Sequence, residues 1–189
     1  IAVDRAFQYP YDYPYEESVT LSVTKDGNGS GTVTSTPAGI NCGSDCSEKF
    51  PFGTAVTLTP TASSGSSFTG WSGACSGNGD CVVTMDADKD VTATFTLESY
   101  QLTVAKDGTG SGTVTSTPAG IDCGSDCSES FTYGTMVTLT ATPDTSSTFS
   151  GWSGACSDKG DCVVTMDTAK SVTATFNPAG SVFLPLVNR

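Results

Sequence analysis

An internal repeat constrains this 189-residue chain more than any other feature of its sequence. When the chain is shifted by 81 positions, residues 21–95 align with 102–176 without a gap, and 55 of these 75 positions are identical. Each copy carries its own cysteines, tryptophan and glycine-rich turn, as a complete structural unit should. We therefore expect two domains of one fold, at 19–98 and 99–178, between an extended N-terminal arm at 1–18 and a C-terminal strand at 179–189.

Apolar residues recur at every second position within each copy, and threonine fills many of the positions between them. Val56 and Leu58 show the pattern in one segment, and Val91, Ala93 and Phe95 show it in another. This period is typical of half-buried β-strands. The glycine-rich segment 25–31 lies between two such segments and favours a hairpin turn. No stretch has helical spacing over three turns, so we expect all-β, antiparallel domains of roughly four to six short strands each.

Eight cysteines, four in each copy, predict that disulfide bonds hold these small domains together. Pairing of close neighbours would stabilise by about 2 kcal/mol per bond on the chain-entropy estimate, whereas pairing across roughly 35 residues would give about 4 kcal/mol. We nevertheless favour the local pairing, because both members of each couplet lie in loops rich in Gly, Ser and Asp that can bend to the required separation. The expected couplets are Cys42 with Cys46, Cys75 with Cys81, Cys123 with Cys127, and Cys156 with Cys162.

The composition favours a location outside the cell and argues against several classes of partner. Only 15% of the residues are charged, and disulfides persist in oxidising compartments, so we expect a secreted product whose signal peptide was removed before Ile1. A net charge of −12 would repel nucleic acid. The chain has no His, the commonest general base, and no apolar run of about 18 residues that would span a membrane.

Several motifs of each copy resemble the divergent internalin B-repeat family of bacterial surface proteins. They are the segment 29–46, which ends in Cys-Gly-Ser-Asp-Cys, the Gly-Thr-Ala-Val-Thr-Leu-Thr segment 53–59, the Phe-Thr-Gly-Trp-Ser-Gly-Ala-Cys segment 68–75 and the Val-Thr-Ala-Thr-Phe strand 91–95. The resemblance covers about 20–96 and 101–177. It implies compact β units related to the β-grasp topology, which serve as spacers or adhesive modules in exported proteins, and it brings no catalytic residue.

Other residues have both a functional and a structural interpretation. Trp71 and Trp152 could stack on sugar rings, but a tryptophan flanked by glycines in both copies is more often part of the core. The triplet Asp86, Asp88 and Asp90 resembles the start of a calcium loop, yet it lacks the later glycine and the distal Glu. We interpret it as a solvated turn. The spacing of the cysteines favours disulfides over zinc, so we expect no metal and no cofactor.

An acidic pair, Asp45 and Glu48, could be read as a glycosidase couple, but its loop offers no apolar pocket. We therefore expect no enzymatic activity.

Both terminal segments lie outside the repeat and are unusually apolar or aromatic. Tyrosine alternates with Pro and Asp in 9–15, which requires an extended backbone, and the apolar run 182–187 contains a proline that suits an edge strand. We expect both arms to dock on folded protein and to form an interface. The candidate interface residues are Ile1, Val3, Phe7, Tyr9, Tyr11, Tyr13, Tyr15, Val182, Phe183, Leu184, Leu186 and Val187.

Two modes of docking lead to different functions. The arms can cap the open ends of their own two-domain array, which leaves a monomer. Alternatively, an arm adds a strand to the neighbouring subunit, and repetition of this head-to-tail contact makes a filament of a single protein. We favour the second, an adhesive or structural fibre subunit at the cell surface. The alternative is a monomeric carbohydrate-binding or surface-binding module of an exported protein, with a polysaccharide or a host or neighbouring cell surface as its partner.

Overall fold

The computed structural model describes residues 17–180, which form fourteen strands and no helix. The chain divides into two compact units. Within the described range, the first comprises the residues up to Ala62 together with Phe68–Phe95, and the second comprises Ser63–Ser67 and the residues from Thr96 onward. The prediction of an all-β fold with tandem domains is confirmed.

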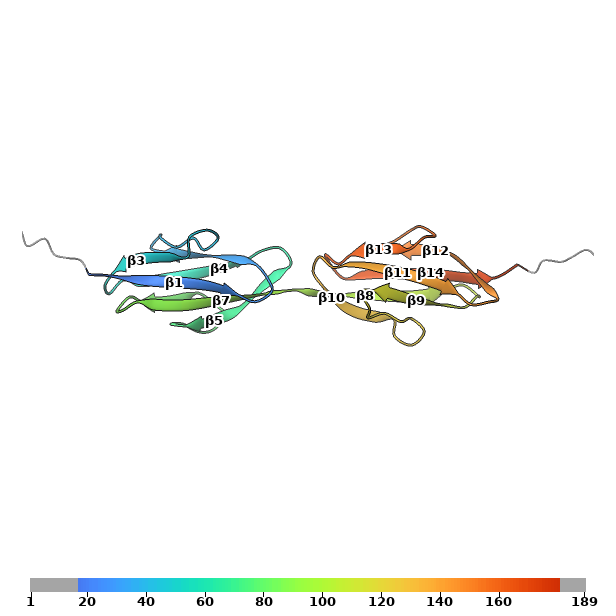
Figure 1. Ribbon diagram of the computed structural model, residues 1–189, viewed down its shortest axis with the longest axis horizontal. Coiled ribbons are helices and arrows are strands. Elements are labelled where there is room, and N and C mark those ends of the chain that lie inside the picture. The colour runs from blue at the N-terminus through green and yellow to red at the C-terminus, as the bar shows by residue number, and fades with distance from the viewer. Residues whose placement is uncertain (1–16, 181–189) are drawn as a thin grey trace, which may run out of the picture. The chain divides into compact units, whose positions relative to one another are not determined.

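Seven strands build the first copy of the repeat (Figure 1). They are β1 (Ser18–Asp26), β2 (Gly31–Thr36), β3 (Ser47–Pro51), β4 (Ala55–Ala62), β5 (Ser66–Gly73), β6 (Cys81–Thr84) and β7 (Lys89–Leu97). One sheet has the order β3-β1-β7-β5 and the other the order β2-β4-β6. Two sheets thus enclose one core.

The second copy repeats this arrangement. Its strands are β8 (Ser99–Asp107), β9 (Gly112–Thr117), β10 (Ser128–Thr132), β11 (Met136–Pro143), β12 (Ser147–Gly154), β13 (Cys162–Thr165) and β14 (Lys170–Pro178). The sheet orders are β10-β8-β14-β12 and β13-β11-β9. In the described part of the chain, no helix has the length and apolarity that crossing a bilayer requires.

The sheets differ from the expected antiparallel pattern in one pair per copy. The first and last strands, β1 and β7, lie side by side and run parallel, with Val23 opposite Val91, and β8 and β14 do the same. Parallel neighbours need a long connection, and here that connection is the rest of the domain. Each copy also has seven strands where roughly four to six were expected, because the short segments β3 and β6 beside the cysteine loops form strands of their own.

The core of each unit consists of the inward side chains of both sheets. In the first unit no more than 1% of the surface of Phe95 and Leu58 is exposed. Phe176 and Leu139 occupy the equivalent places in the second unit. Their outward neighbours are mostly threonines, which explains the period of two in the sequence.

The turn after β1 depends on a glycine. Gly27 has a φ of +94°, and a Cβ at this position would overlap the Phe95 carbonyl oxygen. Only glycine combines this backbone conformation with so close an approach. Gly108 has the same role beside Phe176 in the second unit.

Candidate functional site

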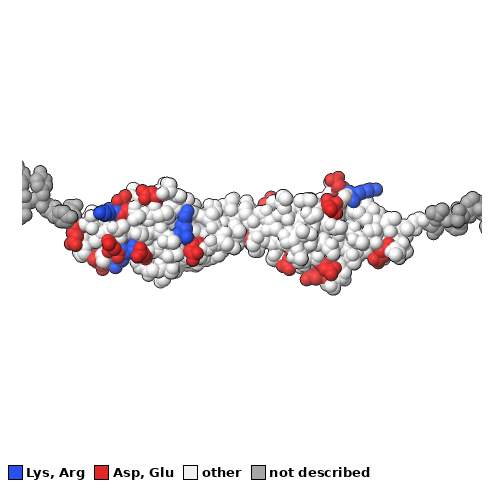
Figure 2. Space-filling model, viewed as in Figure 1, with Lys and Arg blue, Asp and Glu red and all other residues white. Residues whose placement is uncertain are grey.

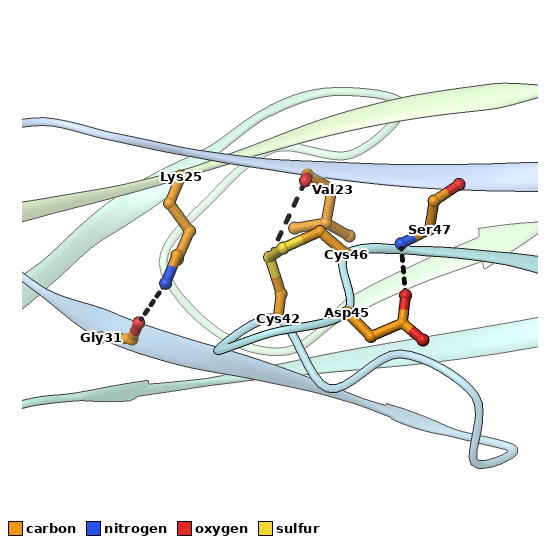
Figure 3. The surroundings of a disulfide bond; sticks show 7 residues. All are labelled: Val23, Lys25, Gly31, Cys42, Asp45, Cys46 and Ser47. Atoms are coloured by element: carbon orange, nitrogen blue, oxygen red, sulfur yellow. Dashed lines mark hydrogen bonds between the residues drawn. A yellow bond between two sulfur atoms is a disulfide. The ribbon is translucent and has the colours of Figure 1, made fainter.

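The first cysteine loop of each unit ties the two sheets together (Figure 3). The Cys42 amide donates to the Val33 carbonyl on β2 at 2.7 Å, and the Val23 amide on β1 donates to the Cys46 carbonyl at 2.8 Å. Figure 3 shows the loop of the first unit, with Cys42 Sγ beside the Val23 carbonyl oxygen. A disulfide joins Cys42 to Cys46, and the Cys42 side chain is fully buried. The loop therefore bonds to one strand of each sheet and fixes their separation at this end of the core.

All eight cysteines are paired in this local pattern. The structure has the disulfides Cys42–Cys46, Cys75–Cys81, Cys123–Cys127 and Cys156–Cys162, and no free cysteine within residues 17–180. Of the two kinds of pairing weighed from the sequence, the structure contains the local one.

The second cysteine loop closes over a buried tryptophan. The Trp71 side chain is 6% exposed, and its indole Nε1 donates to the Gly79 carbonyl at 2.6 Å inside the loop. Its ring lies 4.9 Å from Phe68, which in turn packs against Phe95. Trp152 makes the equivalent bond to the Gly160 carbonyl. The burial supports the core interpretation, because an indole enclosed in this way has no open face for a sugar ring.

A shallow hollow lies beside this loop in the second unit. It has a volume of about 400 Å³ and is lined mainly by Trp152, by residues of the loop such as Ser157, Asp158 and Asp161, and by Val163. Asp161 accepts a hydrogen bond from Thr140 Oγ1 at 3.0 Å.

The acidic side chains that were weighed against catalytic and calcium-binding interpretations make contacts with the protein itself. Asp45 accepts from the Ser47 amide at 3.4 Å and Glu48 from the Lys49 amide at 2.7 Å, so both carboxyl groups bond to the backbone of β3. Asp88 accepts from the Thr20 amide at 2.7 Å. Each of these carboxylates is engaged by the protein backbone.

Asp86, the first acid of the turn, forms an ion pair with Lys89 at 2.6 Å, and Asp167 does the same with Lys170. The hydrogen bond from Lys89, with its positive charge, lowers the pKa of the Asp86 carboxyl, and Lys170 lowers the pKa of Asp167 in the same way. Within residues 17–180, no group of three or more His, Cys, Asp or Glu side chains is placed to hold a metal ion. The ion pair of Asp86 and the backbone contact of Asp88 are contacts typical of a surface turn.

The edges of the sheets differ in how far they are covered. Asn41 forms a bridge to Thr34 at the edge of β2, and Gly77 forms one to Trp71 at the edge of β5. In the described part of the chain, no such bridge lies along β3 or β6, the other two edge strands of the first copy. These two strands are five and four residues long, and short edges of this kind limit unspecific pairing.

The candidate interface residues of the two arms lie outside the described residues. This applies to every member of the set from Ile1 to Tyr15 and from Val182 to Val187. The outward amides of Ser47 and Lys49 on β3, and of Ser128 and Ser130 on β10, already donate to carboxylates. Among the described edge strands, β6 and β13 are therefore the places where a docking strand would find accessible backbone groups.

Sequence reasoning missed one surface. Val82, Met136 and Val163 project from the three-stranded sheets with 62%, 66% and 55% of their surface exposed. The threonines between the apolar positions were read only as fillers of the strand pattern. The signal that could have revealed the surface is the repetition of Thr-x-Thr on several strands of the same sheet.

Comparison with known proteins gives one family match. A family model described as the divergent InlB B-repeat domain matches the chain twice, at residues 19–99 and 100–180. No curated protein matches the chain.

Among solved structures, the Bacillus anthracis TIE protein aligns with a TM-score of 0.53 at 9% identity. The alignment covers 86% of this chain but 34% of that one, so the chain spans about a third of its length. The likeness is one of fold alone.

Two pilins also align, the major pilin T-13 of Streptococcus pyogenes and the minor pilin GBS52 of Streptococcus agalactiae. Each is 10% identical to this chain. The T-13 match covers 86% of this chain and 97% of the pilin, and the GBS52 match covers 90% of this chain and 100% of the pilin. Their TM-scores of 0.34 and 0.33 are too low to carry an argument.

Proposed function

The chain belongs to the divergent InlB B-repeat family, and from this premise we propose that it is a secreted structural or adhesive protein of the cell surface and not an enzyme. We propose further that it is the subunit of an extracellular filament. The observation that carries the proposal is the construction of each unit, a small β domain held by two disulfides whose buried and ionised side chains serve the fold.

The disulfides support the extracellular location. Four bonds in 189 residues require an oxidising compartment to form and persist. They also suit a protein that works outside the cell, because small domains gain stability from covalent links when the core is modest. A net charge of −12 keeps such a protein apart from nucleic acid and favours dispersal before assembly.

Filament assembly in this proposal occurs by strand addition. The apolar arm at 181–189 of one subunit pairs with an edge strand of the next, and the edges that support this proposal are β6 in the first copy and β13 in the second. The contact is heterologous, since the arm and the edge are different surfaces, and a heterologous contact that does not close into a ring grows without limit. A head-to-tail homopolymer is the result.

The alternative is a monomeric carbohydrate-binding or surface-binding module. The hollow beside Trp152 is its best support, because polar loop residues line it. The burial of Trp71 and Trp152 weighs against it, since both indoles lack an open face for stacking. We therefore place the filament first.

A peptide competition tests strand addition. The molar mass of the full chain, measured by light scattering, should rise with protein concentration above the 19.3 kDa of a monomer. A synthetic peptide of residues 181–189 in excess should suppress this rise. A peptide of the same composition in scrambled order is the control. Scattering that stays at the monomer value at every concentration would refute the filament and leave the monomeric module.

A further inference from the structure

The outer faces of the two three-stranded sheets carry an ordered array of threonines. Along β2, β4 and β6, exposed side chains alternate with buried ones such as Val33, Leu58 and Val83. We call the outward set in each copy the threonine face. In the first copy it comprises Thr32, Thr34, Thr36, Ala55, Thr57, Thr59, Thr61, Val82 and Thr84.

The strand register places these threonines opposite one another. Thr32 lies opposite Thr61, Thr34 opposite Thr59, and Thr36 opposite Thr57. Neighbouring strands are about 4.8 Å apart, and outward residues on one strand follow at about 6.7 Å. Rows of hydroxyl and methyl groups therefore cover the face, and the same pairs recur between β9 and β11.

The strands of the threonine face contain no charged residue although the chain is strongly acidic, and in the second copy the Asp161 carboxylate reaches the face at Thr140. None of the residues of β2, β4 and β6, or of β9, β11 and β13, is Asp, Glu, Lys or Arg. In Figure 2, the acidic side chains gather in separate groups with uncharged surface between them. Three of the four large exposed hydrophobic side chains in the described residues, Val82, Met136 and Val163, also lie on this face. Depletion of charge is the compositional mark of an interface core.

Comparison of the two copies shows that this face has changed less than the opposite one. Eight of its nine positions are identical between the copies, and only Ala55, which is replaced by Met136, differs. On the outer face of the four-stranded sheet, six of fifteen positions are identical. The fifteen are Ser18, Thr20, Ser22, Thr24, Asp26, Ser47, Lys49, Pro51, Ser67, Thr69, Ser72, Asp90, Thr92, Thr94 and Thr96, and the identical ones are Ser18, Asp26, Ser47, Ser72, Thr92 and Thr94.

Strand propensity alone does not explain this contrast. Threonine is favoured on any exposed strand, yet on the four-stranded sheet it is replaced between the copies, as at Thr24 by Ala105 and at Thr96 by Asn177. A requirement beyond the strand itself therefore acts on the threonine face.

We propose that the threonine face binds the threonine face of a second copy of this chain, so that neighbouring filaments adhere side by side. This inference rests on the proposed filament. Two molecules that each carry a charge of −12 repel one another, and they approach at least cost where the strands of both surfaces contain no charged residue. Like faces meet in a self-complementary contact, in which methyl groups pack and hydroxyl groups can donate and accept on both sides.

The size of the face indicates how this contact works. Three strands at about 4.8 Å and six residues at about 3.3 Å give roughly 300 Å² per copy. A stable complex buries about 800 Å² per partner, so a single pair of faces holds two molecules only weakly. Subunits in a filament present many faces at once, and multivalency then turns weak contacts into firm lateral adhesion.

Coated beads test the contact without requiring filaments. Beads that carry the full chain through an N-terminal biotin present many copies, and we expect them to clump. The double variant Thr34→Glu with Thr115→Glu adds one charge to an exposed edge-strand position of each face and should slow the clumping by about tenfold or more. The matched control, Ser72→Glu with Ser153→Glu, adds the same charge at exposed positions of the four-stranded sheet and should clump as the unchanged chain does.

The outcomes separate the two proposals. Equal clumping of both variants would overturn the role of the threonine face, and so would beads of the unchanged chain that stay dispersed. If dispersed beads instead bind insoluble cellulose or chitin and Thr34→Glu with Thr115→Glu abolishes this binding, the threonine face binds a polysaccharide and not a second copy. Should the Glu variant unfold, Val82→Gln with Val163→Gln at two exposed positions replaces it. Absence of filaments in the unchanged chain would refute the proposed function alone, because the beads still report on the face.

Discussion

At the scale of single residues, polar groups in this protein serve the fold. Trp71 shows the principle most clearly, because its ring fills the core while its one polar atom bonds to the Gly79 carbonyl of the loop above it. The carboxylates of Asp45 and Asp88 accept from backbone amides, and Asp86 pairs with Lys89. Side chains that are used in this way are not free for chemistry.

The first prediction concerns this tryptophan. Replacement of Trp71 by Ala should lower the free energy of unfolding of the first unit by about 3–5 kcal/mol, since it leaves a cavity and unpairs the Gly79 carbonyl. Denaturant unfolding monitored by circular dichroism measures the change. Val82→Ala, at an exposed position, is the control and should change stability by about 0.5 kcal/mol or less. A loss as small as the control's would show that Trp71 is not part of the core.

At the scale of strands and loops, close packing between the sheets decides which residues are allowed. Gly31 is the first residue of β2 and lies directly against the buried ring of Phe95. A Cβ at this position would overlap the ring. Gly112 and Phe176 repeat the contact in the second unit. The hairpin between β1 and β2 thus depends on glycine for space as well as for backbone freedom.

Gly31→Ala should therefore destabilise the first unit by about 1–3 kcal/mol, the usual cost of overpacking. Gly43→Ala is the matched control, because a Cβ at Gly43 would meet only Thr32 Cγ2 at an ordinary 3.5 Å. Thermal unfolding of the two variants separates the effects. If both melt at the same temperature as the unchanged protein, the packing of Phe95 against β2 is looser than described.

Many of the strands were predictable from the sequence, for physical reasons that apply to particular residues. The alternation of Val91, Ala93 and Phe95 with threonine predicted the strand and its buried face, because the period of a strand is a local property. The parallel pairing of β1 with β7 was not predictable, since it joins segments separated by almost the whole domain.

The sequence predicted the local cysteine pairing but gave too few strands for each copy. Strands as short as β6 have too few residues to show a period. The energetic estimate favoured crossed disulfides, but the Gly, Ser and Asp residues around each couplet indicated the local bonds that the structure contains. The threonine face was missed because its rows of side chains form only when three strands come into register.

At the scale of the whole molecule, duplication supplies two similar units, and each presents uncovered sheet edges and a face whose strands contain no charged residue. In our account the edges accept an arm of the next subunit to form the filament, and the faces join filaments laterally. The two contacts use different surfaces, so each can be removed while the other remains.

Electron microscopy of three proteins tests the central claim most directly: the full chain, a version without residues 1–15 and a version without residues 181–189. The account predicts that the full chain forms filaments and that the version without residues 181–189, the docking arm, forms none. The truncated protein should keep its circular dichroism spectrum and its four disulfides. Isolated particles in all three samples would contradict it and would return the arms to the role of caps on a monomeric surface module.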